Sequence, residues 1–516
     1  MSSTAMARAL VTQLAAAGVR DVVLAPGSRS APLAYAVADA EGAGWLRAHV
    51  RVDERTAGFF ALGLARAAAL RGESRVVAIV TTSGTAVANL HPAVLEAAHS
   101  GLPLLVVSTD RPHEWHGTGA NQTTRQTGLF GSAVRATVEL PARANPAAAR
   151  GQVARLVAAA LGTLTRDPGP VHLNVSFAEP LVPDCPWETG ALPAPLRVEP
   201  APVPVPVELP AGRRTLAVAG DGAGPDAHRL ATEAGWPLLA EPSSGARLPG
   251  AIVGYLRHLA AGLAEDVERV VVFGHPTLSR PISSLLGRPG VEVVVVSPTA
   301  RWTDVTGTAE RVAGAIAVAA PEASDRAWLQ RWWDADAGPT PDPTPIQRAA
   351  SVLWATEGWL VLGSSNTVRA FDAVAPGAER GTRVVANRGL AGIDGLVSTA
   401  HGLAAGLGEP VRLVLGDLSF AHDVGGLARG EDEPEVDLQV VVLNDHGGGI
   451  FSSLEHAAAE PGLFRRFFGT PQVQDVVAAA HGVGARASRV TVDGLADAVA
   501  VPVSGRAVLD VALLPE

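Results

Sequence analysis

The stretches VRLVLGDLSF (residues 411–420) and LQVVVLNDHGGGIF (residues 438–451) decide the fold of this chain. Each begins as a short, nearly continuous run of branched apolar residues and ends in a polar loop that contains glycine. Such runs are typical of strands that are buried on both faces of a parallel sheet. In open sheets of this kind ligands bind at the carboxyl ends of the strands. The two loops are therefore the first candidates for a functional site.

The two loops carry oxygen ligands and glycines. Asp417 lies just after the first predicted strand, residues 411–415, and Asp445 lies just after the second, residues 438–443. Their carboxylates and a backbone carbonyl at Gly447 suit Mg²⁺, which completes its shell with water and phosphate oxygens. The glycines at 447–449 let the backbone come close to a diphosphate. Either loop alone is also ordinary turn chemistry after a strand, but the pair favours a metal and diphosphate site.

Similar apolar runs recur along the whole chain and alternate with alanine-rich segments. The predicted strands, besides the two above, are residues 22–25, 76–80, 104–108, 171–175, 215–219, 238–240, 270–273, 291–296, 359–362, 383–386 and 507–511. Segments such as residues 4–17 and 56–69 read as helices between them. This alternation predicts an α/β fold.

Two proline-rich stretches divide the chain. Prolines alternate with other residues through 192–210, and a second polar, proline-rich stretch covers 335–345. Such segments cannot sustain a helix and favour extended connectors. We therefore predict three consecutive doubly wound parallel-sheet domains. Their predicted ranges are residues 1–190, then a linker at 191–210, then 211–335 and 345–516.

Composition narrows the function. The chain has 516 residues, a formal net charge of −10, and Cys185 as its single cysteine. The charge argues against nucleic acid as the main partner, and one cysteine excludes an internal disulfide. The chain has no lysine, which excludes Schiff-base and Walker A lysines. No run reaches the length of a membrane span and no signal peptide is visible, so we expect a cytoplasmic protein.

A carboxylate stands where the stretch HVRVDER (residues 49–55) ends a predicted strand and opens a helix near Thr56. Glu54 at that place is explained without any function, because a helix start favours a negative charge.

The pair of loops at residues 416–417 and 444–445 resembles the signature of thiamine-diphosphate enzymes, which starts with Gly-Asp and ends downstream in Asn-Asn. Here the pattern is Gly416-Asp417 followed by Asn444-Asp445, so that Asp445 stands where the second Asn is usual. The departure leaves open whether Mg²⁺ or Mn²⁺ is preferred. Thiamine enzymes also need a glutamate from an N-terminal domain, which hydrogen-bonds the aminopyrimidine ring of the cofactor. The resemblance assigns this role to Glu54.

Seven blocks in order resemble one family, the 2-succinyl-5-enolpyruvyl-6-hydroxy-3-cyclohexene-1-carboxylate synthases. The blocks are residues 25–33, 52–55, 109–112, 119–122, 387–395, 416–420 and 447–451. The family implies pyrimidine-binding, central and diphosphate-binding domains, in that order. It also implies thiamine diphosphate with Mg²⁺ or Mn²⁺, and a homodimer or homotetramer with active sites between subunits.

The implied reaction belongs to menaquinone biosynthesis. It decarboxylates 2-oxoglutarate and adds the resulting carbanion to isochorismate in a conjugate (1,4) addition. Both substrates carry carboxylates, which arginine binds with a planar fork. The resemblance assigns catalysis to Glu54, Ser28, Arg29, Gln122 and Arg388; the cofactor to Glu54, Gly416, Asp417, Leu418, Ser365, Gly448, Ile450 and Phe451; the substrates to Ser28, Arg29, Arg111, Asn121, Gln122, Arg280, Ser365, Arg369, Arg388 and Phe451; and the metal to Asp417, Asp445 and Gly447.

Simpler interpretations stand beside these assignments. Ser28 could be the cap of the next helix, single arginines are more often surface groups, and Ile450 and Phe451 could be helix-core residues. Another thiamine enzyme, such as an acetolactate synthase or a 2-oxoacid decarboxylase, is the first rival function, although the arginines favour dicarboxylates. A non-catalytic relative that acts as a binding subunit is the second. A nicotinamide enzyme ranks third, because no Gly-x-Gly-x-x-Gly opens a first strand–helix unit.

Overall fold

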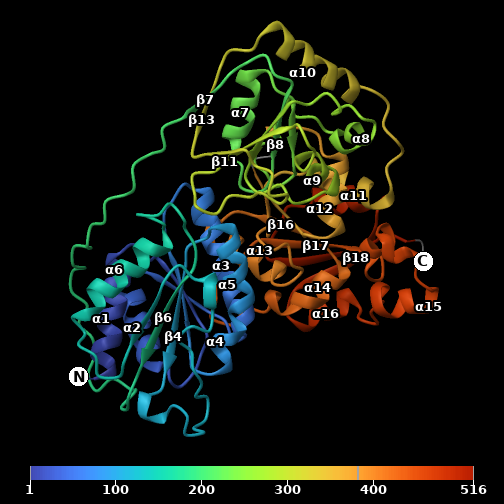
Figure 1. Ribbon diagram of the computed structural model, residues 1–516. Helices are drawn as coiled ribbons and strands as arrows, with labels where there is room; N and C mark the ends of the chain where they lie inside the picture. The colour runs from blue at the N-terminus through green and yellow to red at the C-terminus, as the bar shows by residue number, and fades with distance from the viewer. Residues whose placement is uncertain (1, 380–382, 515–516) are drawn as a thin grey trace.

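The computed structural model describes residues 2–379 and 383–514. Three parallel sheets, each in its own α/β unit, follow one another along the chain (Figure 1). The predicted fold class is therefore confirmed. The predicted domain boundaries stay predictions, and their ends at Met1 and residues 515–516 lie outside the described residues.

The N-terminal unit has a six-stranded sheet in the order β2-β1-β3-β4-β6-β5. Its strands are β1 Asp21–Leu24, β2 Arg47–Val50, β3 Val77–Thr81, β4 Leu104–Asp110, β5 Thr137–Leu140 and β6 Val171–Ser176. Its helices are α1 Ser3–Ala16, α2 Ala31–Gly42, α3 Glu54–Leu70, α4 Thr85–Asn89, α5 His91–Ser100 and α6 Ala148–Ala160. Strands β1, β3, β4 and β6 are buried throughout, because helices cover both faces of the sheet.

The central unit has a five-stranded sheet in the order β12-β11-β10-β8-β9. Its strands are β8 Thr215–Ala219, β9 Leu238–Ala240, β10 Arg269–Phe273, β11 Glu292–Val296 and β12 Arg311–Ala313, and its helices are α7 Pro225–Ala234, α8 Tyr255–Ala260, α9 Arg280–Leu286 and α10 Ala323–Asp336. A separate pair joins β7 Val207–Leu209 to β13 Ile316–Val318. Residues 207–209 at the end of the predicted linker therefore form a strand, which the alternating prolines before it did not indicate.

The C-terminal unit has a six-stranded sheet in the order β15-β14-β16-β17-β19-β18. Its strands are β14 Trp359–Leu362, β15 Val384–Ala386, β16 Val411–Gly416, β17 Leu438–Asn444, β18 Arg486–Thr491 and β19 Arg506–Ala512. Its helices are α11 Pro345–Trp354, α12 Asn366–Val374, α13 Leu396–Leu407, α14 Asp417–Asp423, α15 Pro461–Phe464, α16 Val476–Gly482 and α17 Leu495–Ala500. Both quoted stretches form neighbouring parallel strands, with Gly416 in register with Leu443.

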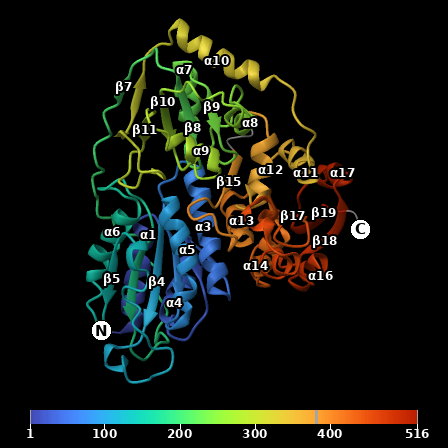
Figure 2. The same cartoon turned by 45° about the vertical axis from the view of Figure 1, so that its right-hand side comes forward.

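Helices α3 and α13 join the N-terminal and C-terminal units, and both views show them side by side (Figures 1 and 2). Glycines make the close approach possible. A side chain at Gly63 would collide with the Thr399 carbonyl, and one at Gly402 with the Phe60 carbonyl. The helix that begins at Glu54 is therefore fixed directly against the unit that carries Asp417.

No helix in the described part of the chain is both long enough and apolar enough to span a membrane.

Candidate active site

Two carboxylates meet at the carboxyl edge of the C-terminal sheet. Asp417 is the first residue of α14, directly after β16, and Asp445 directly follows the neighbouring strand β17. Burial, and next the charge of Asp445, raise the pKa of Asp417 to about 6. Burial also raises the pKa of Asp445. Two partly buried carboxylates at neighbouring strand ends, one of them disfavoured by the charge of the other, are a suitable ligand pair for a divalent cation.

The glycine loop beside these carboxylates leaves no room for side chains. Gly447 has φ +146°, and a side chain there would collide with the Gly469 carbonyl. The amide of Gly448 donates to that same carbonyl at 2.7 Å. A side chain at Gly449 would overlap the Asp445 carboxylate. The carboxylate pair fits a divalent metal ion, and the glycine backbone carries no side chain that would keep a diphosphate away.

Ile450 and Phe451 follow in the short 3₁₀ turn Gly449–Ser453 and are half-buried. The Phe451 ring lies 5.7 Å from that of Phe468, centroid to centroid. Phe451 therefore belongs to an aromatic loop cluster, and both residues lie in a 3₁₀ turn rather than in an α-helix.

Glu54 begins α3, two residues before the predicted helix start. Asp53 caps the helix, because its carboxylate accepts the amide protons of Arg55 and Thr56. The Glu54 carboxylate itself accepts one long bond, from the Asn89 amide at 3.4 Å. The contact of Glu54 with a cofactor between two subunits stays a prediction.

The first arginine group, Arg29 and Arg111, lies in the N-terminal unit. Arg29 is 6% exposed, donates to the Phe177 carbonyl at 2.9 Å, and lies over the Trp115 ring. Arg111 donates to the Ser83 hydroxyl and to the Gln122 carbonyl. Burial, and next the charge of Arg111, lower the pKa of Arg29. Two guanidinium groups thus share one electrostatic environment.

The other predicted residues of this unit lie in loops. The Ser28 carbonyl accepts the Ala31 amide, and the residue at the N-cap of α2 is Ser30. The interpretation of Ser28 as a helix cap is therefore wrong. Gln122 adopts φ +53°, and the Asn121 carbonyl accepts the Thr123 hydroxyl.

The second arginine group, Arg369 and Arg388, lies where the central and C-terminal units meet. Arg388 is 3% exposed and donates to the Thr277 hydroxyl at 3.3 Å and to the Ser364 carbonyl at 3.4 Å. Arg369 donates to the Ser365 carbonyl at 2.9 Å. Burial, and next the charge of Arg388, lower the pKa of Arg369. The predicted residues therefore form separate groups within one chain.

Arg280 lies apart from both groups. Its side chain is 78% exposed and pairs at 3.3 Å with Glu455, whose side chain is 64% exposed. Its substrate role stays a prediction.

Within the described residues, four of the five predicted substrate arginines form no ion pair with a carboxylate. Across residues 2–379 and 383–514, no ion pair engages the guanidinium groups of Arg29, Arg111, Arg369 or Arg388. Arg29 and Arg388 are buried and Arg111 is half-buried, whereas Arg369 is exposed. A buried charge without a paired counter-ion is costly. The two groups therefore suit anions that come from outside the chain.

Sequence reasoning missed several residues that contact these arginines. Ser83 and Trp115 contact the first group, and Thr277 contacts Arg388. Glu96 contacts the backbone that follows Arg388. Ser83 could have been found from its place in the polar turn after a predicted strand, whereas Glu96 sits in an alanine-rich helix and gave no signal.

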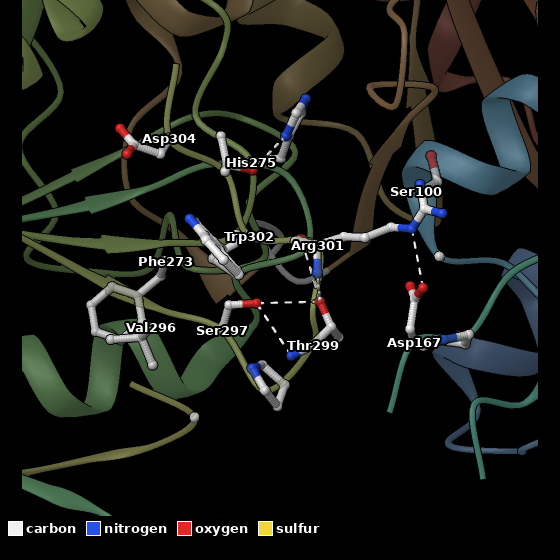
Figure 3. A pocket seen from close by; sticks show the side chains of 18 of the residues that line it. Ser100, Asp167, Phe273, His275, Val296, Ser297, Thr299, Arg301, Trp302 and Asp304 are labelled. Atoms are coloured by element: carbon white, nitrogen blue, oxygen red, sulfur yellow. Dashed lines mark hydrogen bonds and ion pairs between the residues drawn. The ribbon is translucent and has the colours of Figure 1, made fainter. Parts of the chain in front are cut away.

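A cavity of about 880 Å³ opens elsewhere, at the carboxyl ends of β10 and β11 (Figure 3). His275 and Ser297 follow those strands, and Arg301 crosses to Asp167 of the N-terminal unit at 3.1 Å. None of the predicted site residues is among those that line it. The cavity therefore does not coincide with the predicted active site.

Comparisons with known proteins agree with the fold and the motifs. Residues 4–129 match the family model described as "Thiamine pyrophosphate enzyme, N-terminal TPP binding domain". The crystal structure of benzoylformate decarboxylase from Polynucleobacter necessarius superposes with a TM-score of 0.69 over 100% of this chain and 99% of that one. At 18% identity this likeness concerns the fold alone.

Closer relatives are curated as 2-succinyl-5-enolpyruvyl-6-hydroxy-3-cyclohexene-1-carboxylate synthases. The protein of Kineococcus radiotolerans is 48% identical over 94% of this chain and 91% of its own length. The protein of Nocardioides sp. is 46% identical over 99% of this chain and 95% of its own length. The protein of Paenarthrobacter aurescens is 45% identical over 99% of this chain and 94% of its own length. The resemblance is confirmed: the chain belongs to the 2-succinyl-5-enolpyruvyl-6-hydroxy-3-cyclohexene-1-carboxylate synthase family of thiamine-diphosphate enzymes.

Proposed function

We propose that this chain catalyses the reaction for which its relatives are named. It decarboxylates 2-oxoglutarate and adds the succinyl-semialdehyde carbanion to isochorismate in a conjugate (1,4) addition, a step of menaquinone biosynthesis. The single observation that supports this choice most is that Arg29, Arg111 and Arg388, two of them buried and Arg111 half-buried, form no ion pair with a carboxylate of the described residues. Arg29, Arg111 and Arg388 suit substrates with several carboxylates better than they suit pyruvate.

The cofactor site follows from the C-terminal sheet. Asp417, Asp445 and the carbonyl of Gly447 would hold Mg²⁺ or Mn²⁺. The backbone around the glycine loop would accept the diphosphate, with the remaining cofactor contacts from Gly416, Leu418, Ser365, Gly448, Ile450 and Phe451. Bound thiamine diphosphate supplies an electron sink that stabilises the carbanion left by decarboxylation.

Glu54 is the proposed proton-handling group. Its carboxylate would hydrogen-bond a ring nitrogen of the aminopyrimidine and hold a proton there. Its one hydrogen bond within the described residues, from Asn89, is long, which leaves the carboxylate available to this partner. Ile450 and Phe451 would present an apolar wall, which disfavours a charged carboxylate beside it and so favours loss of CO₂.

The remaining side chains bind and orient the substrates. The two arginine groups would hold carboxylates of donor and acceptor close to each other, and proximity of this kind lowers the barrier. We assign supporting contacts to Ser28, Asn121, Gln122, Ser365, Arg280 and Phe451.

The active unit is proposed to be a homodimer or a homotetramer in the cytoplasm. An active site between two copies would bring Glu54 of one copy and Asp417 of the other to one cofactor. A twofold symmetric dimer would then contain two equivalent sites.

CO₂ release tests the proposal against its first rival. The purified protein, loaded with thiamine diphosphate and Mg²⁺, receives either 2-oxoglutarate or pyruvate, with and without isochorismate. We expect release from 2-oxoglutarate and a carboligation product only when isochorismate is present. Faster turnover of pyruvate would favour an acetolactate synthase or a simple decarboxylase instead, and no cofactor binding by calorimetry would favour a non-catalytic subunit.

A further inference from the structure

Glu96 joins two units that are far apart in sequence. It lies on α5 of the N-terminal unit and is 4% exposed. Its Oε1 accepts the amide of Gly389 at 2.8 Å, and its Oε2 accepts the amide of Leu390 at 2.8 Å. The Ser100 hydroxyl donates to Oε1, also at 2.8 Å. One carboxylate therefore holds two consecutive amides of the C-terminal unit.

The held amides directly follow Arg388. Charge-assisted bonds from a carboxylate to backbone amides are stronger than neutral ones, whereas the bonds of the Arg388 guanidinium to Thr277 and Ser364 are long. Its Nε has no partner among the described residues. The position of this side chain therefore depends more on its backbone than on its own contacts.

Gly389 allows the close approach. A side chain there would lie 2.8 Å from the Glu96 carbonyl and 2.8 Å from the Ser100 hydroxyl. Helix α5 and the loop after β15 are thus packed at backbone distance, so a small displacement of either would move Arg388.

We propose that Glu96 is a positioning residue for the reaction: it grips the Gly389 and Leu390 amides and thereby holds Arg388 where a substrate carboxylate binds. The inference rests on the proposed function, since it takes Arg388 as a substrate ligand. The competing explanation is that Glu96 only ties two units together. In that case its loss would lower stability and would act independently of Arg388.

A double-mutant cycle separates the two explanations. The variants are Glu96→Gln, Arg388→Ala and the double variant, each assayed for kcat and KM with both substrates. The neutral amide of Gln accepts one amide proton and turns its own NH₂ group toward the other. We expect the KM of at least one substrate to rise about tenfold, as loss of a charge-assisted bond implies, with thiamine diphosphate affinity unchanged. In the Arg388→Ala background the same change should add less than about twofold.

Matched variants keep the test sharp if Glu96→Gln folds poorly. Gly389→Ala disturbs the same contact from the other side and leaves both charges intact, so it should reproduce the rise in KM. Arg71→Gln removes a different tie between the units, the bond from Arg71 to the Leu407 carbonyl. It should lower the melting temperature without a change in KM.

Independent, multiplying losses in the Glu96 and Arg388 variants would overturn the inference, as would unchanged KM values for both substrates in Glu96→Gln and Gly389→Ala. A wild-type protein that releases no CO₂ from 2-oxoglutarate would instead refute the proposed function.

Discussion

The change Glu54→Gln separates chemistry from folding at the proposed site. Gln keeps the size of the side chain and removes its ability to hold a proton as a carboxylate. General acid–base groups contribute about 100- to 10,000-fold to enzymatic rates. We therefore expect kcat to fall by a factor in that range while thiamine diphosphate still binds.

The structure indicates that folding should hardly change. Asp53, not Glu54, supplies the cap of α3, and the bond from Asn89 to Glu54 is long at 3.4 Å. The remaining effect is the loss of a favourable charge at a helix start, which costs on the order of 0.3–1 kcal/mol. A melting temperature close to that of the wild type should accompany the loss of rate.

The assay compares CO₂ release from 2-oxoglutarate with cofactor binding by calorimetry. Asp53→Asn is the matched control, because it removes a charge one residue away and Asn still caps a helix. We expect it to keep most of the activity. If Glu54→Gln turned over within about tenfold of the wild type, too little for general acid–base catalysis, the proton-handling role would be refuted.

Three further predictions concern the loop, the metal and the helix pair. Gly447→Ala should weaken thiamine diphosphate binding about tenfold or more in calorimetry, because strain at φ +146° and the collision with the Gly469 carbonyl cost on the order of 1–3 kcal/mol. The apparent affinity for Mg²⁺ should be highest above about pH 7 and should fall as the pH drops through about 6. The reason is that the metal binds deprotonated Asp417, and the pKa of Asp417 is raised to about 6. An affinity that stayed unchanged down to pH 5 would contradict this expectation. Gly402→Ala should lower the free energy of unfolding in chemical denaturation by about 1–3 kcal/mol, because the new methyl group would collide with the Phe60 carbonyl. The control Gly151→Ala places its methyl group in open space and should leave the free energy of unfolding unchanged or raise it.

The sequence predicted the interior strands well. Strand β16 ends one residue beyond the prediction, and β8 and β14 coincide with it, because buried strands are continuous apolar runs. The edge strands β5 and β18 were missed: residues such as Glu139 and Arg489 face solvent there, so no apolar run marks them.

The site was predictable where it depends on loops after strands. Asp417 and Asp445 lie at neighbouring strand ends, as the motif indicated. Glu96 was not predictable, because its partner Gly389 lies 293 positions away in sequence. Nor could the sequence indicate that Arg280 would lie on the surface beside Glu455, since that pairing depends on how the central unit packs.

The central claim is that Glu54 of one subunit and Asp417 of another act on the same cofactor. Mixing inactive Glu54→Gln and Asp417→Asn proteins, after dissociation and reassembly, tests it directly. Random pairing would give heterodimers in half of the molecules, each with one intact site out of two, so about a quarter of wild-type CO₂ release should return. If the reassembled mixture stayed as inactive as its parents while heterodimers were demonstrably present, the shared active site would be contradicted.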